Sequence, residues 1–300
     1  MRPSFHNIPK ISIVTPSFNQ GRFLEETIQS ILSQNYPNLE YVIVDGGSSD
    51  NSVEIIKKYS DRLHFWISEK DDGHGDAISK GFLHTSGEIM AWLNSDDKYT
   101  PWSLQIVSRI FTLFPHVNWI VGFNSWWSAD GVMTHASRVP KNIYDFLLGN
   151  YAWIQQESVF WRRTLWEKAG AYIDTEYKFM VDGELWTRFF LHEDLYSVDC
   201  ILGGYRSHSN NRATQNYDSC LREMHRAVLR MREKCSSDVL NHHNKLKIIN
   251  NLMRLRVLRS FPIWQTTRRI MFRDAFNAAS YKNIFYDEEM WKQRTLPFPF

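Results

Sequence analysis

Cysteine is scarce in this sequence, and long apolar runs are missing. The 300 residues include 3 cysteines, none of them in a CxxC pair or at metal-site spacing, which suits a reducing compartment. No run approaches the ~20 apolar residues that a membrane-spanning helix needs. The N-terminus lacks a basic region followed by an apolar one and a cleavage site, so we expect no signal peptide. These absences predict a cytoplasmic protein, either soluble or attached peripherally to the inner face of the membrane.

A GxGxxG motif is also missing after the first predicted strand, which counts against a dinucleotide-dependent dehydrogenase. The composition, 43% hydrophobic and 23% charged, is that of a globular protein with a sizeable core. The net charge of +2 conceals an asymmetry, because residues 1–200 contain 17 Lys and Arg against 25 Asp and Glu, whereas residues 201–300 contain 18 against 8. We therefore predict two segments, residues 1–210 and 211–300, the second being basic and facing an anionic partner or surface.

Apolar spacing predicts alternating strands and helices in the first 122 residues. Apolar and β-branched runs at 11–15, 40–45, 63–67, 88–93 and 117–121 are typical of strands. Apolar residues at helical spacing predict helices at 21–34, 53–59, 76–84 and 102–114, and later at 141–148, 163–169, 184–192 and 217–234, followed by a basic amphipathic segment at 245–259. The alternation predicts an α/β fold with a mostly parallel sheet, helices on both faces and a helical, basic C-terminal extension.

Polar residues cluster at the carboxyl ends of three predicted strands, where parallel sheets bind ligands. They are Thr15-Pro16-Ser17, Asp45 and Asn94-Ser95-Asp96-Asp97. In the last cluster the apolar run GEIMAWL leads into two adjacent carboxylates, which raise each other's cost of ionisation. A divalent cation or a basic side chain from elsewhere would lower this cost. The structural alternatives are a helix N-cap for Asp97 and a hydrogen-bonded turn for Asp45.

Three further stretches have both a chemical and a structural interpretation. The segment 71–76, DDGHGD, is acidic and rich in glycine, so that its backbone could approach a ligand closely or form a surface loop. Asp182 lies between apolar residues in MVDGELW, where burial would raise its pKa, and a helix cap is the alternative. His208 is by default a surface histidine.

Taken together and in this order, the stretches resemble the inverting family 2 glycosyltransferases of GT-A fold. The resemblance is carried by ISIVTPSFNQGRFLEETIQSILSQNYPNLEYVIVDGGSSDNS, EKDDGHGDAISKGFLHTSGEIMAWLNSDD, IQQESVFWRRTLWEKAG and VDGELWTRF, between about residues 10 and 210. It implies a GT-A nucleotide-sugar-binding domain over residues 1–210. It also implies transfer of a sugar from a nucleoside-diphosphate sugar, most commonly a UDP-sugar, to a hydroxyl acceptor in surface glycan biosynthesis.

The resemblance also implies roles for individual residues. Asp182 occupies the position of the family's general base, and one base without a protein nucleophile implies inversion. Mg²⁺ or Mn²⁺ on the diphosphate would be held by Asp96, Asp97 and His208. The donor would be bound by Thr15, Pro16, Ser17, Asn19, Asp45, Asp76, Asn94, Ser95 and Asp96. Asn94 replaces the first acid of the Asp-x-Asp motif, so that one charge is missing, and Asp97 could restore it.

The expected partners are the nucleotide-sugar donor and a glycan or lipid-linked saccharide acceptor, without nucleic acid. Trp153 and Gln156 are predicted to contact the acceptor, in an aromatic region that includes Tyr151, Trp161 and Trp166. The basic region 211–300 would contact the acceptor, an anionic membrane surface or a second copy in a homo-oligomer.

Two alternatives to this enzyme stay open. A non-catalytic nucleotide-sugar-binding or assembly subunit would not need the base and the metal acids that the chain retains. A sugar nucleotidyltransferase would need a glycine-rich loop bearing Lys or Arg after the first strand, where residues 16–20 read PSFNQ.

Overall fold

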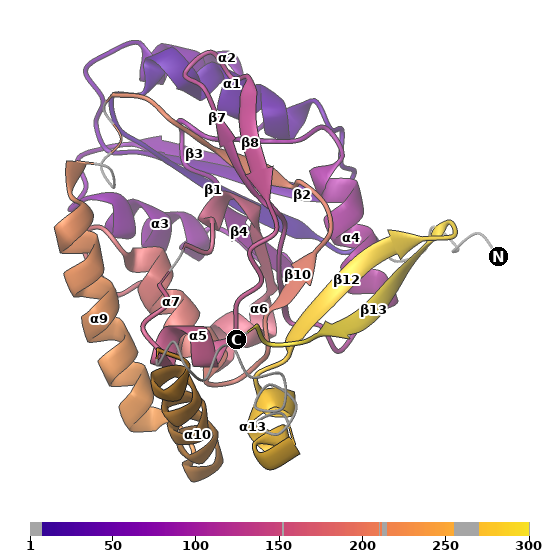
Figure 1. The fold of residues 1–300 in the computed structure, drawn as a ribbon. Helices are drawn as coiled ribbons and strands as arrows, with labels where there is room; N and C mark the ends of the chain where they lie inside the picture. The colour runs from indigo at the N-terminus through magenta and orange to yellow at the C-terminus, as the bar shows by residue number, and fades with distance from the viewer. Residues whose placement is uncertain (1–7, 152, 210, 212–214, 255–269, 300) are drawn as a thin grey trace.

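The computed structural model describes residues 8–151, 153–209, 211, 215–254 and 270–299. Its main sheet has nine strands: β1 (Ile11–Ser17), β2 (Leu39–Asp45), β3 (Phe65–Ser68), β4 (Ile89–Trp92), β6 (Trp119–Val121), β9 (Val159–Arg162), β10 (Tyr196–Val198), β12 (Tyr281–Asp287) and β13 (Met290–Leu296). Their order across the sheet is β13-β12-β10-β6-β9-β4-β1-β2-β3 (Figure 1).

Most neighbouring strands of this sheet are parallel. β1 pairs in parallel with β2 and β4, β2 with β3, and β10 with β6 and β12. β9 is antiparallel to β4 and β6, and β13 to β12. All seven residues of β1 are buried, as expected for a strand covered on both faces. The predicted mostly parallel sheet is therefore confirmed, and the ends of β1, β2 and β4 lie at one edge of it.

Helices cover both faces of the sheet, as predicted. They are α1 (Gly21–Leu32), α2 (Ser52–Lys58), α3 (His74–Leu83), α4 (Ser103–Leu113), α5 (Ile143–Leu147), α6 (Arg163–Lys168), α7 (Val181–Phe190), α9 (Tyr217–Lys234), α10 (Ser237–Arg254) and α13 (Arg273–Ala278), with 3₁₀ turns η1 (Ser60–Arg62) and η2 (Gln156–Ser158). In Figure 1, α1 and α2 lie on one side of the sheet, and α3 and α7 on the other. In α1 the helical spacing buries Leu24, Ile28 and Ile31 completely against the sheet.

A second, four-stranded sheet was not predicted. It contains β5 (Lys98–Tyr99), β7 (Asn124–Trp127), β8 (Met133–Ser137) and β11 (Gly203–Arg206) in the order β5-β11-β7-β8. β11 passes so close to η2 that a Cβ on Gly203 would lie 2.2 Å from the carbonyl oxygen of Glu157. Only glycine fits there, and the close approach brings Arg206 beside the acidic turn that follows β4.

The C-terminal extension was predicted to be helical, and its described residues form α9, α10 and α13, followed by the strands β12 and β13. The predicted helix 217–234 coincides with α9, and the predicted amphipathic segment 245–259 falls within α10 up to residue 254, its remainder lying outside the described residues. The hairpin of β12 and β13 was missed, and β12 joins the main sheet beside β10. The division at residue 210 stays a prediction. Within the described part of the chain, no helix has the length and apolar character needed to cross a bilayer.

Candidate active site

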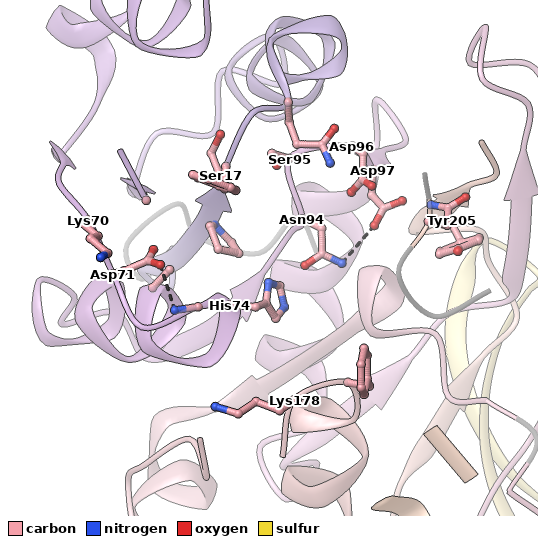
Figure 2. Close-up of a pocket in the computed structure, with 18 residues that line it drawn as sticks. Ser17, Lys70, Asp71, His74, Asn94, Ser95, Asp96, Asp97, Lys178 and Tyr205 are labelled. Atoms are coloured by element: carbon pink, nitrogen blue, oxygen red, sulfur yellow. Dashed lines mark hydrogen bonds between the residues drawn. The ribbon is translucent and has the colours of Figure 1, made fainter. Parts of the chain in front are cut away.

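A cavity of about 490 Å³ lies where β1, β2, β3 and β4 end. Its lining comes from the tips of these strands, from the start of α3, from the segment before α7 and from β11 and the residues after it (Figure 2). The lining residues are Pro16, Ser17, Phe18, Gln20, Gly46, Lys70, Asp71, Gly73, His74, Ala77, Asn94, Ser95, Asp96, Asp97, Lys178, Phe179, Tyr205 and Asn211. This is the position at which ligands bind in open parallel sheets.

Five of the nine predicted donor-binding residues line the cavity. They are Pro16, Ser17, Asn94, Ser95 and Asp96. Two of them present unsatisfied polar atoms, because Ser17 Oγ and Asn94 Oδ1 are buried without a hydrogen-bond partner among the described residues. Burying such atoms unpaired is costly. A ligand with hydroxyl or N–H donors in this cavity would remove the cost.

The other four predicted donor residues do not line it. Asp45 is completely buried and closes its own turn, accepting hydrogen bonds from Ser48 N–H at 2.9 Å and from the Ser68 hydroxyl at 2.7 Å. Asp45 thus makes the contacts of a hydrogen-bonded turn, which was the structural alternative to donor binding. The hydroxyl of Thr15 bonds Tyr41 at 3.0 Å.

Asn19 and Asp76 are likewise engaged locally. The Asn19 side chain accepts from Ser49 N–H at 2.9 Å. Asp76 accepts from Asp72 N–H at 3.1 Å and pairs with Lys80 at 3.2 Å. The glycine-rich segment does reach the cavity, which it lines through Asp71, Gly73 and His74 rather than through Asp76.

Asp96 and His208 meet although they are 112 residues apart in the chain. His208 Nε2 lies 3.0 Å from Asp96 Oδ2, and the two side chains are 5% and 18% exposed, so His208 is not a surface histidine. A carboxylate oxygen beside an imidazole nitrogen fits a divalent cation such as Mn²⁺ or Mg²⁺. No group of three or more His, Cys, Asp or Glu side chains among the described residues is arranged to hold a metal.

Asp97 is held by protein groups on both of its carboxylate oxygens. Oδ1 accepts from Arg206 N–H at 2.8 Å, and Oδ2 accepts from Asn94 Nδ2 at 3.2 Å. Burial, followed by the charges of Glu157 and Asp96, raises the pKa of Asp97 well above its usual range. Asp96, rather than Asp97, is the acid that the geometry favours as a metal ligand.

Asp182 lies in the first turn of α7, which begins three residues before the predicted helix start at 184. Burial raises the pKa of Asp182 to about 6, with a further contribution from the charge of Glu223. Phe179, three residues earlier, lines the cavity. The pKa of Glu157 is raised to about 7, mainly by burial and then by the charges of Asp182 and Asp96. Asp182 itself does not line the cavity, as Asp96 does, but it follows the lining residue Phe179 by three positions.

The predicted acceptor region is only partly exposed. Trp153 is half-buried, and its ring contacts Tyr217 of α9 edge-to-face, with ring centroids 6.2 Å apart. Gln156 is buried and bonds the carbonyl oxygen of Trp92 through its side-chain amide. Trp161 and Trp166 belong to the core. β9 and α6 turn Trp161 and Trp166 inward, and η2 buries Gln156, so these three side chains form no open surface; acceptor binding by Trp153 and Gln156 stays a prediction.

Several residues of the site were missed by the sequence analysis. Lys178 and Phe179 line the cavity, and Glu157 is a buried acid whose pKa is raised by burial and by the charges of Asp182 and Asp96. Each lies next to or inside a stretch that the resemblance already covered, namely IQQES and VDGELW. An acid inside an otherwise buried turn was the available signal for Glu157.

Comparison with known proteins decides the family. The sequence profile of Glycosyl transferase family 2 matches residues 12–194, which is more than half of the chain. The chain belongs to glycosyl transferase family 2. The matched range begins in β1 and ends beyond α7, so it includes Asp96 and Asp182 but not His208.

Curated relatives of this family 2 chain are moderately similar. An uncharacterized glycosyltransferase of Nostoc sp. is 28% identical over 187 residues, which cover 58% of this chain and 57% of that protein. An uncharacterized glycosyltransferase of Mycobacterium tuberculosis is 28% identical over 198 residues, covering 65% and 74%. The putative teichuronic acid biosynthesis glycosyltransferase TuaG of Bacillus subtilis is 35% identical over 94 residues, covering 30% and 37%. The chain thus spans little more than half the length of the Nostoc relative.

Solved structures share the fold at low sequence identity. Staphylococcus aureus TarS 1–349 in complex with UDP-GlcNAc has a TM-score of 0.61 and 16% identity, covering 90% of this chain and 81% of that chain. The mannosyltransferase PcManGT from Pyrobaculum calidifontis, in complex with GDP-Man and Mn²⁺, has a TM-score of 0.53 and 16% identity, covering 89% and 86%. The expected GT-A type fold is confirmed by this similarity.

Proposed function

We propose that this protein is an inverting glycosyltransferase that moves a sugar from a nucleoside-diphosphate sugar, preferably a UDP-sugar, to a hydroxyl of a glycan or lipid-linked saccharide in surface glycan biosynthesis. The observation that carries the proposal is the position of Asp182, whose pKa is raised to about 6, three residues after Phe179 in the cavity wall, together with the contact of His208 with the lining residue Asp96. A carboxylate with this pKa is ionised at neutral pH, yet basic enough to accept a proton.

Asp182 is the proposed general base. An acceptor hydroxyl is a weak nucleophile at pH 7, and a carboxylate within ~2.6–3.2 Å is needed to take its proton during attack. Asp182 accepts that proton while the acceptor oxygen attacks the anomeric carbon and the nucleoside diphosphate departs from the opposite face. A single displacement of this kind inverts the anomeric centre.

Asp96 and His208 are the proposed ligands of Mn²⁺ or Mg²⁺. When bound, such a cation neutralises the charge that develops on the departing diphosphate. Ser17 and Asn94 would orient the donor through their unpaired polar atoms. The cationic side chains of Lys70 and Lys178 line the same cavity and favour an anionic ligand there. The choice of UDP is supported by the complex of the fold relative TarS with UDP-GlcNAc, whereas PcManGT binds GDP-Man.

A thermal-shift panel tests the donor assignment. UDP-, GDP- and dTDP-sugars are compared with and without Mn²⁺, since a ligand that binds only the folded state raises its stability by about 2.7 kcal/mol at 100 times Kd. We expect the largest shift with a UDP-sugar and Mn²⁺ together. A panel in which no sugar nucleotide raises the melting temperature contradicts the proposal. Release of UDP from the stabilising donor then separates an enzyme from a non-catalytic binding subunit.

The acceptor side is proposed to include Trp153. Its half-buried ring contacts Tyr217 edge-to-face, and aromatic rings can stack on the apolar faces of sugars. The basic C-terminal region is proposed to contact an anionic membrane surface, where a lipid-linked acceptor would lie. Co-sedimentation with vesicles of anionic lipid, compared with zwitterionic vesicles, tests this contact, and equal binding to both would contradict it.

A further inference from the structure

Glu223 makes an unusual set of contacts across the boundary between the two predicted segments. From the middle of α9, its Oε1 accepts a hydrogen bond from Lys178 N–H at 2.9 Å. Its Oε2 accepts from Phe179 N–H and from Met180 N–H, both at 2.9 Å. One carboxylate thus binds three consecutive backbone N–H groups, and hydrogen bonds to a charged acceptor are among the stronger ones in proteins.

The segment that Glu223 binds joins two parts of the active site. Lys178 and Phe179 line the cavity, and Met180 is the N-cap residue of α7. Asp182 follows two residues later, in the first turn of the helix. A displacement of this segment would therefore move the cavity wall and the proposed base together.

The start of α7 has no side-chain cap of its own. Met180 is apolar, and no side-chain hydrogen bond caps the helix from that position. A negative charge near a helix N-terminus is favourable, and Glu223 adds its charge from another helix to those of Asp182 and Glu184 in the first turn. Glu223 does not replace a capping side chain, which would accept from an N–H inside the first turn; it fixes the N-cap residue and the two residues before it.

α9 can approach α7 closely because Gly183 has no side chain. A Cβ on Gly183 would lie 2.1 Å from Met224 Sδ, and Met224 is the residue next to Glu223. Met224 is buried, and α7 and α9 lie side by side (Figure 1). The contact that positions Glu223 is thus a packed helix pair rather than a surface ion pair.

We propose that Glu223 is a positioning residue for the transfer reaction, holding residues 178–180 so that the cavity wall and Asp182 keep their working geometry. The proposal rests on the proposed function. It makes α9 part of the catalytic unit, although α9 lies beyond residue 210 and beyond the range matched by the family profile. Glu223 does not touch the reacting atoms.

The charge of Glu223 provides a readout that a purely structural contact lacks. Burial is the main cause of the raised pKa of Asp182, and the charge of Glu223 adds to it. Glu157, on η2, is a second acid near Asp182, because the charge of Asp182 contributes to its raised pKa. Replacing Glu223 with glutamine keeps an acceptor oxygen but removes the charge, so the pKa of Asp182 should fall.

The experiment compares Glu223→Gln and Glu223→Ala with Glu233→Gln, a change at an exposed position on the same helix. Amide hydrogen exchange is measured on peptides covering residues 178–183, and kcat, KM and the pH profile are measured with the sugar nucleotide selected by the donor panel. We expect faster exchange in Glu223→Ala and an intermediate rate in Glu223→Gln. We also expect kcat to fall by up to about 100-fold in Glu223→Ala, the size of effect caused by small misplacements.

The pH profile distinguishes positioning from general stability. In Glu223→Gln the acid limb should move to lower pH, whereas Glu233→Gln should match the wild type in exchange, kcat and pH profile. Unchanged exchange at residues 178–183 in Glu223→Ala, or a kcat and acid limb equal to those of Glu233→Gln, would overturn the proposal. A wild-type protein that turns over no sugar nucleotide would instead overturn the proposed function, and amide exchange would still decide whether Glu223 holds the segment.

Discussion

The acid limb of the pH–rate profile is the sharpest test of Asp182 as the base. Burial, with a contribution from Glu223, raises the pKa of Asp182 to about 6. Transfer needs the ionised carboxylate, so the rate should follow the ionised fraction, about one half at pH 6 and about one tenth at pH 5. An aspartate with the ordinary pKa near 3.9 would still be about 90% ionised at pH 5. We therefore expect kcat to fall about tenfold between pH 7 and pH 5.

The assay measures release of the nucleoside diphosphate at saturating donor, acceptor and Mn²⁺. Asp182→Asn should lower kcat by about 10²–10⁴-fold, the usual contribution of a general base. Glu157→Gln is the matched control, because burial and neighbouring acids also raise the pKa of Glu157, to about 7. The acid limb near pH 6 should persist in Glu157→Gln. A limb that disappears in Glu157→Gln, or a wild-type limb below about pH 4.5, would refute the assignment.

Three further substitutions have expected outcomes. Asp96→Ala should weaken Mn²⁺-dependent donor binding by at least about tenfold in calorimetry, whereas Asp130→Ala, at an exposed position, should not. Arg206→Ala should lower the free energy of unfolding by about 2 kcal/mol in urea, because it removes a buried guanidinium bonded to Glu26 at 2.6 Å; an unchanged midpoint would contradict this. Glu157→Gln should raise the melting temperature of the metal-free protein more at pH 8 than at pH 5. Folding raises the pKa of Glu157 from 4.5 to about 7, so this carboxyl lowers the stability of the folded state as the pH rises through that range, and glutamine does not. Equal rises in melting temperature at the two pH values would contradict this.

Much of the fold could be predicted from local sequence patterns. The short β-branched run ISIVT is typical of a strand covered on both faces and forms β1, and the helical spacing of Leu24, Ile28 and Ile31 marks α1. The hairpin of β12 and β13 was not predictable in this way, because its outer strand is largely exposed and mixes charged with apolar residues. β5 and β11 are two and four residues long, and pair only through contacts distant in sequence.

The candidate site was predictable where chemistry follows a strand end, and not where it depends on tertiary contacts. Asp96 could be identified because it follows a buried strand in the chain. For Asp45 the sequence allowed either donor binding or a hydrogen-bonded turn. The hydrogen bonds from Ser48 and Ser68, which only the structure shows, favour the turn. Glu223 had no local signal, since its role depends on α9 packing against α7.

The acids around the cavity explain why metal and donor binding should depend on each other. Burial raises the pKa values of Asp97 and Glu157, and the charges of Asp96 and Asp182 make ionisation of Glu157 still harder. A divalent cation beside Asp96 would favour the ionised forms, so its binding should release protons. A diphosphate would otherwise meet an excess of negative charge, which the cation offsets. Because coupling between two ligands is reciprocal, the donor should tighten Mn²⁺ binding by the same factor by which Mn²⁺ tightens donor binding.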